Sequence, residues 1–532
     1  MTTSRREFLA GLAAAGVVLP GLSGVRLLPR AQAAGLALPS PAQLAWQDLE
    51  LGMFIHFGPN TWQEQEYDDR TTPLDAVDPD IDTDQWVETA VGMGARYIVM
   101  VAKHVGGFCW WQTQTTEYSV RNTPWKSGRG DVMTDLALSC AARNMQLGVY
   151  LSPRDDSVGA GGSGRCSTPE AQARYDALYR QQLTELLTRY GPIMELWLDG
   201  SSVVPTIDIV RRYAPDAMIF QGPNATIRWV GNEDGFAPYP CWNSLAAIDA
   251  DTGVATAMHG DPAGDRWMPV EVDVSLRRPN WFWSTTNHAN LLSLEQLVEI
   301  YYRSVGRGTQ LLLNVTPDRT GHVPQADVDR LTEFGTEIRR RLARSLAETN
   351  GAGTDLHLDL GRSVRVNHVV IEEYLRDGER IRGWRLEGLT DGAWRTLAEG
   401  SAIGRKRIQP IDAAVLSSVR LRVTRSVGEP SIRRLAAYGV GSPPPATWSE
   451  PVHLWADDVA GRWTDGNVEI DLASRIDGPG RYRVRLAAQS GTPVALHDAG
   501  MEIDGERTNL ILRPADGRSD LFYLDLRQDV QA

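Results

Sequence analysis

Strand-like and helix-like segments alternate along the chain from about residue 40 to residue 346, and this alternation is the strongest constraint on the fold. Short apolar runs predict strands at residues 52–57, 96–102, 146–151, 193–198, 217–220, 268–274 and 309–314. Helices are expected between and after them, at residues 83–91, 132–143, from 168 onward, 207–213, 293–305 and 326–346. Repeated strand–helix units over such a length are typical of a (β/α) barrel of the TIM type. No glycine-rich dinucleotide or phosphate loop follows the first strand, which disfavours an open sheet.

The chain is too long, at 532 residues, for one hydrophobic core. After residue 349 the pattern changes to short alternating runs separated by turn residues, which is typical of β-sandwiches. A stiff proline-rich linker follows at residues 441–446, and further β-like runs lie beyond it. The expected fold class is therefore α/β, with a TIM-like barrel over residues 34–349 followed by two β-sandwich-type domains, at 350–441 and 447–532.

Residues 1–33 are expected to be an export signal rather than part of the fold. Ser4-Arg5-Arg6-Glu7-Phe8-Leu9 resembles a twin-arginine signal, an apolar stretch follows it, and Ala31-Gln32-Ala33 is a small-residue cleavage pattern. The apolar stretch is far shorter than the roughly 20 residues of a membrane span, so a membrane anchor is disfavoured. The mature protein is expected in the cell envelope or outside the cell.

Charge and composition narrow the choice of partners. The net charge is −13 and the basic residues form no long block, so nucleic acid is disfavoured as a partner. The 17 tryptophans outnumber the nine phenylalanines, and flat indole rings often stack on sugars, which leans toward carbohydrate. The four cysteines form no metal-binding pattern, and neither a metal nor another cofactor is expected.

One predicted strand, at residues 193–198, ends abruptly in Asp199 and Gly200. In a (β/α) barrel, the carboxyl ends of the strands form the face on which active sites are built. Asp-Gly is also a strong turn signal in any protein. This segment alone therefore leaves Asp199 open as either a catalytic residue or a turn cap.

Polar side chains also follow the three preceding strands of the predicted barrel. The first strand ends in His56, with Glu66 and Tyr67 in the next loop, the second is followed by His104, and Tyr150 lies near the end of the third. Several polar strand ends on one face of a barrel are what a catalytic site requires. Together with the aspartate of the fourth strand, they favour an active site.

This ordered set resembles the α-L-fucosidases of glycoside hydrolase family 29, over nearly all of residues 40–346. The similar motifs are Phe54-Ile-His56-Phe-Gly58, Ala102-Lys-His104, Gly106-Gly-Phe-Cys-Trp110, Thr116-Glu-Tyr-Ser-Val120, Gly148-Val-Tyr-Leu-Ser-Pro153, Glu195-Leu-Trp-Leu-Asp-Gly200 and Leu311-Leu-Leu-Asn314-Val. The resemblance implies a retaining glycosidase that acts on a fucosylated oligosaccharide or glycoconjugate.

The resemblance also implies roles for individual residues. In that family the aspartate of the Trp-x-Asp-Gly motif is the nucleophile, which here is Asp199, and Trp197 lies beside it. The residues expected to bind substrate are His56, Glu66, Tyr67, His104, Tyr150, Trp197, Arg228 and Trp283.

The acid/base partner of Asp199 has two candidates. Arg228-Trp-Val-Gly-Asn-Glu233-Asp-Gly235 resembles a motif of the subfamily that prefers α1,3/1,4-linked fucose, whose glutamate is the acid/base. Glu271, in the predicted strand at 268–274, is the alternative. Glu233 is favoured because a polar loop can reach over the barrel, whereas a carboxylate within a strand more often orients its neighbours. A retaining mechanism requires two carboxyl groups about 5–5.5 Å apart.

The chain also departs from the family pattern. Val105-Gly106 stands where the family commonly has His-Asp, and Arg154 stands where a tryptophan often follows Ser-Pro. The interval from Asp199 to Glu233 is shorter than is typical of the subfamily. These changes leave two alternatives open, a retaining glycosidase for a related sugar such as L-galactose and a non-catalytic secreted glycan-binding protein on the same fold.

Residues 350–440 resemble a galactose-binding-like domain of the discoidin (coagulation-factor type C) kind. The similarity rests on Leu358-Asp-Leu-Gly361 and on the spacing of Trp384 and Trp394. Such domains can bind glycans, but a structural prop for the barrel is an equally good interpretation.

Overall fold

The computed structural model describes residues 36–246 and 259–441, together with short strands between residues 463 and 524. The expected export signal (1–33) and most of the expected last domain (447–532) lie outside the described residues. The chain divides into two compact units, one of residues 36–449 and one made of its two ends. In the latter, the described strands pair antiparallel: β17 (Trp463–Thr464) with β18 (Asn467–Val468), β20 (Gly500–Ile503) with β21 (Glu506–Asn509), and β23 (Leu521–Leu524) with β19 (Val484–Ala487) and β22 (Leu512–Pro514).

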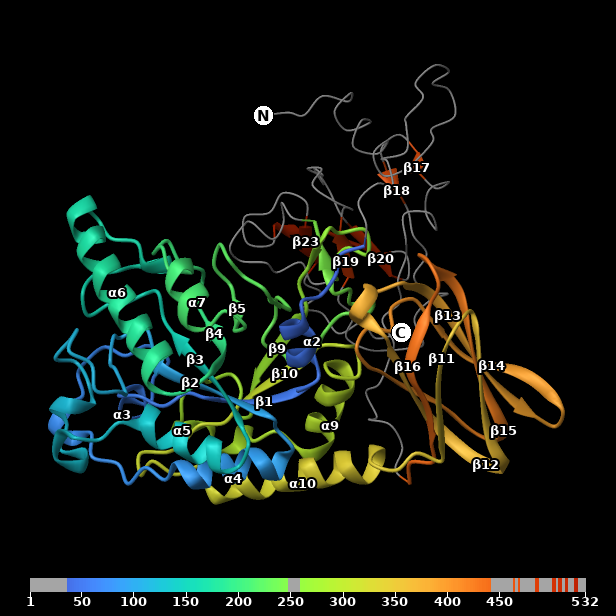
Figure 1. The fold of residues 1–532 in the computed structure, drawn as a ribbon, viewed down its shortest axis with the longest axis horizontal. Coiled ribbons are helices and arrows are strands. Elements are labelled where there is room, and N and C mark those ends of the chain that lie inside the picture. The colour runs from blue at the N-terminus through green and yellow to red at the C-terminus, as the bar shows by residue number, and fades with distance from the viewer. Residues whose placement is uncertain are drawn as a thin grey trace, which may run out of the picture. The chain divides into compact units, whose positions relative to one another are not determined.

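Eight parallel strands form the centre of the large unit, in the order β5-β4-β3-β2-β1-β10-β9-β6 (Figure 1). Their bounds are β1 (Leu51–Ile55), β2 (Tyr97–Lys103), β3 (Gln146–Leu151), β4 (Ile193–Trp197), β5 (Met218–Phe220), β6 (Arg228–Trp229), β9 (Val270–Ser275) and β10 (Gln310–Asn314). A parallel bridge between Phe220 and Ile227 brings the two edges of this sheet together. The predicted TIM-like barrel is confirmed as a nearly closed one.

Helices precede, separate and follow most of these strands along the chain and pack around the barrel (Figure 1). They are α2 (Pro41–Gln47), α3 (Asn60–Gln63), α4 (Thr83–Met93), α5 (Val132–Ala142), α6 (Pro169–Arg189), α7 (Ile207–Tyr213), α9 (Leu294–Arg303) and α10 (Gln325–Leu342). Helix α6 begins where Thr168 accepts a hydrogen bond from the N–H of Ala171, and α9 begins at a capping box formed by Ser293 and Gln296. No helix in the described part of the chain is long and apolar enough to cross a membrane.

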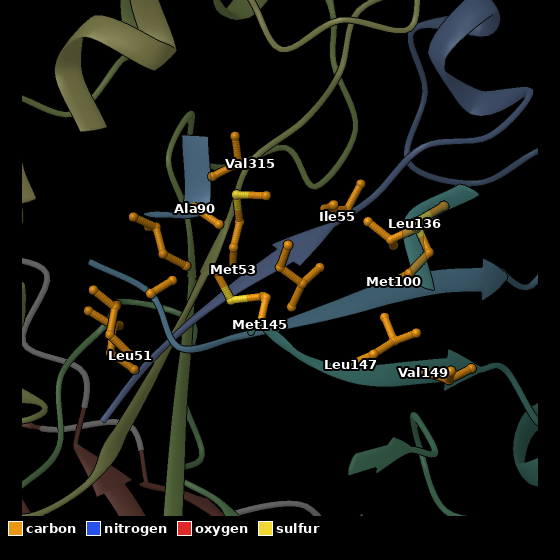
Figure 2. Close-up of a cluster of buried hydrophobic side chains, with 14 of the residues drawn as sticks. Leu51, Met53, Ile55, Ala90, Met100, Leu136, Met145, Leu147, Val149 and Val315 are labelled. Atoms are coloured by element: carbon orange, nitrogen blue, oxygen red, sulfur yellow. The ribbon is translucent and has the colours of Figure 1, made fainter. Parts of the chain in front are cut away.

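Alternate residues of the strands enter two different cores. Figure 2 shows part of the outer core, in which Met53 and Ile55 of β1 lie among apolar residues of neighbouring strands and helices. The barrel interior holds a second cluster, which includes Phe54 and Tyr97. Gly52 makes room for this cluster, because a Cβ atom there would lie 2.3 Å from the ring of Tyr97.

A six-stranded antiparallel sheet follows the barrel, in the order β11-β16-β12-β15-β13-β14. Its strands are β11 (Ala347–Ala352), β12 (Asp355–Glu373), β13 (Ile381–Thr390), β14 (Ala393–Gly400), β15 (Arg407–Ser426) and β16 (Ser431–Tyr438). It has an apolar core of its own. The predicted boundary at residue 349 falls inside β11, because β11 pairs with β16 from Ala347 onward.

Buried polar contacts tie the barrel to this sheet domain. The N–H of Asn243 donates to Glu379 across 2.9 Å, and the Tyr239 hydroxyl accepts from the N–H of Ser401 and donates to the carbonyl of Ala402. Both barrel residues belong to the segment that follows Glu233. The sheet domain therefore supports the barrel segment that follows Glu233.

Candidate active site

The ends of β1 to β4 bring four of the predicted site residues together. The rings of His56 and His104 lie 5.8 Å apart, and His104 stacks on Tyr150 at 5.7 Å. The Tyr150 hydroxyl lies 3.1 Å from Oδ2 of Asp199. Because these strands are neighbours in a parallel sheet, their ends meet on one face of the barrel.

Both histidines of this cluster are neutral near physiological pH. Burial, together with the electrostatic effect of His104, holds the pKa of His56 well below its usual value. The 2.8 Å hydrogen bond between His56 Nδ1 and Asn314 Oδ1 opposes this decrease. Burial and the charge of Arg154 lower the pKa of His104 to about 4. A neutral imidazole offers one donor and one acceptor, which suits the hydroxyl groups of a sugar.

Tyr150 orients the carboxylate of Asp199, and this carboxylate does not cap the turn that follows the strand. The N–H of Gly200 donates instead to Gln221, at 2.6 Å, and the N–H of Ser201 donates to the carbonyl of Leu198. Asp199 as a whole residue is exposed to solvent, although its carboxyl group is partly desolvated. Desolvation raises its pKa, the Tyr150 hydrogen bond opposes this rise, and the negative charge of Glu233 adds to it. Asp199 is therefore an accessible and oriented carboxyl group.

Glu233 lies on a tight loop that leaves β6. Gly231 and Gly235 have φ values of 89° and 80°, which favour glycine, and Asn232 accepts a hydrogen bond from the N–H of Asp234. The exposed Glu233 side chain accepts a 3.3 Å hydrogen bond from Trp281 Nε1. Its charge acts on both Asp199 and Glu66, so the three carboxyl groups belong to one region.

Glu66 is the third carboxyl group of this region. Its Oε2 accepts a 3.0 Å hydrogen bond from the N–H of Trp281. Burial raises the pKa of Glu66 to about 7, with added repulsion from Glu233 and Asp199. Glu66 is therefore partly protonated near neutral pH and can donate a hydrogen bond as well as accept one.

Trp281 and Phe282 form an aromatic wall beside the histidines. The rings of both lie 5.3 Å from that of His56. Trp283, the predicted substrate contact, packs instead against His288, with the guanidinium of Arg319 5.6 Å from its ring centre. The sequence indicated this segment of three consecutive aromatic residues, and the role of Trp283 as a substrate contact stays a prediction.

Arg228 and Tyr67 do not join the central cluster. Arg228 is fully buried, and its guanidinium donates to the carbonyls of Met268 and Trp242. These bonds hold the side chain inside the protein, and its role as a substrate contact stays a prediction. Tyr67 is 60% exposed and lies against Arg154, at the rim.

Glu271, the alternative acid/base, lies inside the barrel. Its two oxygens accept hydrogen bonds from Trp197 Nε1, at 2.7 Å, and from the Tyr97 hydroxyl, at 2.9 Å. Burial and the neighbouring carboxyl group of Glu195 raise the pKa of Glu271 well above its usual value. Because protein donors occupy both oxygens, this geometry disfavours Glu271 as the proton donor to a leaving group.

The altered motif after His104 has a packing explanation. A Cβ atom on Gly106 would lie 2.3 Å from Oδ2 of Asp68. Asp68 is buried there and accepts hydrogen bonds from Tyr118 and Gln63, at 2.7 and 2.8 Å. Both Gly106 and Asp68 line a small cavity beside His104. A carboxylate from the loop after β1 thus fills the space next to this glycine.

Comparison with known proteins gives consistent matches. Residues 63–340 match the sequence profile of the family described as "Alpha-L-fucosidase". The chain is 32% identical over 454 residues to "Alpha-L-fucosidase 1" of Arabidopsis thaliana, which covers 76% of this chain and 88% of that protein.

Solved structures share the fold. A Bacteroides thetaiotaomicron VPI-5482 protein superposes with a TM-score of 0.72 at 32% identity, over 76% of this chain and all of that one. A Ruminococcus gnavus family 29 fucosidase solved in complex with fucose superposes with a TM-score of 0.69 at 27% identity, over 78% and 97% of the two chains.

Proposed function

Because the chain belongs to the α-L-fucosidases of glycoside hydrolase family 29, we propose that Asp199 and Glu233 hydrolyse a terminal α-L-fucoside by retaining double displacement. The observation that carries this assignment is the accessible carboxylate of Asp199, oriented by Tyr150. Its electrostatic coupling to Glu233 supports the pairing of the two carboxyl groups.

The reaction proceeds in two steps. In the first, Asp199 attacks the anomeric carbon while Glu233, as the acid, gives its proton to the departing glycosidic oxygen. In the second, Glu233 removes a proton from water, and the hydroxide oxygen displaces Asp199 from the covalent glycosyl-enzyme. Fucose leaves with its α configuration, and Glu233 has regained its proton.

The surrounding groups suit a deoxy sugar. Neutral His56, whose Nδ1–H donates to Asn314, offers Nε2 as an acceptor to a ring hydroxyl, and neutral His104 offers a further ring nitrogen. The aromatic wall of Trp281 and Phe282 suits the C6 methyl group. The fucose complex of the Ruminococcus gnavus relative supports the same sugar here. The resemblance of residues 228–235 to a subfamily motif supports a preference for α1,3/1,4 linkages.

The N-terminal sequence supports export through a twin-arginine signal. The antiparallel domain at Ala347–Tyr438 is compatible with the discoidin-like resemblance, and its contacts with Tyr239 and Asn243 favour a supporting role beside the barrel.

A substrate panel tests the proposal. The purified protein is incubated with aryl α-L-fucoside, aryl α-L-galactoside and a Lewis-type oligosaccharide, and NMR records the first anomer released. We expect cleavage of the fucoside and the oligosaccharide, with α-fucose appearing first. Cleavage of the galactoside alone would instead support the related-sugar alternative. Fucose binding without any cleavage would support the glycan-binding alternative.

A further inference from the structure

Strand β9 directs two carboxyl groups into the barrel, and each accepts a hydrogen bond from an indole. Glu271 accepts from Trp197 Nε1 across 2.7 Å, and Asp273 accepts from Trp229 Nε1 across 2.6 Å. Val272, the residue between them on this strand, belongs to the outer core, so the two carboxyl groups share the opposite face of β9. Both are buried.

The first indole leads to the proposed nucleophile. Trp197 lies two residues before Asp199 and stacks on Phe220, with ring centres 3.6 Å apart. It also stacks on Tyr150, whose hydroxyl donates to Asp199. Fixing the Trp197 ring therefore fixes both the main chain that carries Asp199 and the tyrosine that orients it.

The second indole leads to the proposed acid/base. Trp229 lies four residues before Glu233 and ends β6, a strand of only two residues. Backbone hydrogen bonds from the N–H groups of Arg228 and Val230 attach this short strand to Pro269 and Glu271, and the bond from Trp229 to Asp273 adds a side-chain attachment to β9. Asp273 also interacts electrostatically with Glu233, which places it near the acid/base loop.

We propose that Glu271 and Asp273 are positioning residues, through which β9 sets the places of Asp199 and Glu233 by holding Trp197 and Trp229. This inference rests on the proposed function. Both carboxyl groups accept an indole hydrogen bond, and burial raises the pKa of each well above its usual value, which favours the uncharged form. An amide oxygen can replace such an acceptor, whereas a methyl group cannot.

The test compares Glu271→Ala and Asp273→Ala with Glu271→Gln and Asp273→Asn. For Glu271→Ala, kcat/KM should fall about 10²-fold on activated and poor leaving groups alike, because the nucleophile is displaced. Asp273→Ala should lose most on a poor leaving group, which depends on Glu233. The amide variants should regain activity to within about tenfold of wild type, since they keep the acceptor.

Two controls keep the test decisive if the alanine variants are unstable. Trp111 Nε1 donates to Glu185 across 2.8 Å in a buried indole–carboxylate pair on the outer layer, so Glu185→Ala should lower Tm without changing kcat/KM. Trp229→Phe removes the second indole N–H and keeps a ring, so it should reproduce the loss of Asp273→Ala. The double variant with both Trp229→Phe and Asp273→Ala should lose little more activity than either single variant.

The outcomes separate the inference from the proposed function. If wild type cleaves no fucoside, the proposed function fails and the variants are irrelevant. If wild type is active and the alanine variants match it, the positioning role is wrong. If Glu271→Ala spares activated substrates and azide restores turnover, Glu271 is the acid/base instead. If the amide variants lose as much as the alanine variants, acceptor geometry is not what the two residues supply.

Discussion

Tyr150 donates its phenolic hydrogen to Oδ2 of Asp199 across 3.1 Å, which joins the ends of the neighbouring strands β3 and β4. A hydrogen bond to the charged form of a carboxyl group favours that form and fixes its lone pairs. The same bond opposes the effect of desolvation on the pKa of Asp199. Tyr150 thereby favours the ionised form of the proposed nucleophile and directs its carboxylate.

Removal of this bond should have two effects. Tyr150→Phe should lower kcat/KM for an aryl fucoside by about 10–100-fold, the usual contribution of a hydrogen bond to a charged group. The pKa of Asp199 should rise without the bond, so the acidic limb of the kcat/KM profile should move to higher pH. A profile that keeps the wild-type limb would contradict the role given to Tyr150.

Removal of the nucleophile should be far more severe. Asp199→Gly should reduce turnover on the order of 10⁴-fold or more, the scale seen for essential catalytic groups. Azide can enter the vacated space and attack the anomeric carbon, so it should restore cleavage of an activated fucoside and yield β-fucosyl azide. The product is identified by NMR. Unchanged turnover in this variant would exclude Asp199 as the nucleophile.

Glu66 should make stability depend on pH. Its folded-state pKa, about 7, lies above the usual 4.5, so the folded protein disfavours its charged form. The stability associated with the protonated group is fully present below pH 4.5 and is lost as pH rises through 7. Glu66→Gln should therefore stabilise the protein at pH 8 by about 1–2 kcal/mol, a value reduced for partial burial, and have little effect at pH 4.5. Thermal unfolding at the two pH values measures this difference.

Gly106 should tolerate no larger side chain. Gly106→Ala places a Cβ atom 2.3 Å from Asp68 and should cost about 1–3 kcal/mol of unfolding free energy, as overpacking does. Gly162 is the matched control, because a Cβ atom there meets nothing within 4 Å. Denaturant unfolding of both alanine variants makes the comparison. Equal stability of the two would contradict the packing explanation.

The two outer tryptophans of residues 281–283 should differ in their effect on activity. Trp281→Ala removes a ring that packs against His56 and a donor to Glu233, so kcat/KM should fall about tenfold or more. Trp283→Ala should stay within about threefold of wild type, because this ring packs against His288 and Arg319. The reverse order of losses would restore the sequence-based choice of Trp283.

Local patterns in the sequence determined the barrel and the ends of its strands. Apolar runs of four to seven residues predicted the strands, and the Ser293 capping box predicted the start of a helix. Because parallel strand ends meet on one face, the order His56, His104, Tyr150 and Asp199 was enough to predict that these side chains lie together. The two-residue strand β6 was missed, since it is too short to carry a pattern.

Only the tertiary structure decided the partners of these residues. Glu271 and Trp197 are 74 residues apart in sequence, and Glu66 and Trp281 are 215 apart, yet both pairs are hydrogen-bonded. The burial of Arg228 and the close approach of Asp68 to Gly106 likewise depend on elements distant in the chain. Strand positions follow from the period of a few neighbouring side chains, whereas side-chain partners inside a barrel are selected by close packing among all of its strands.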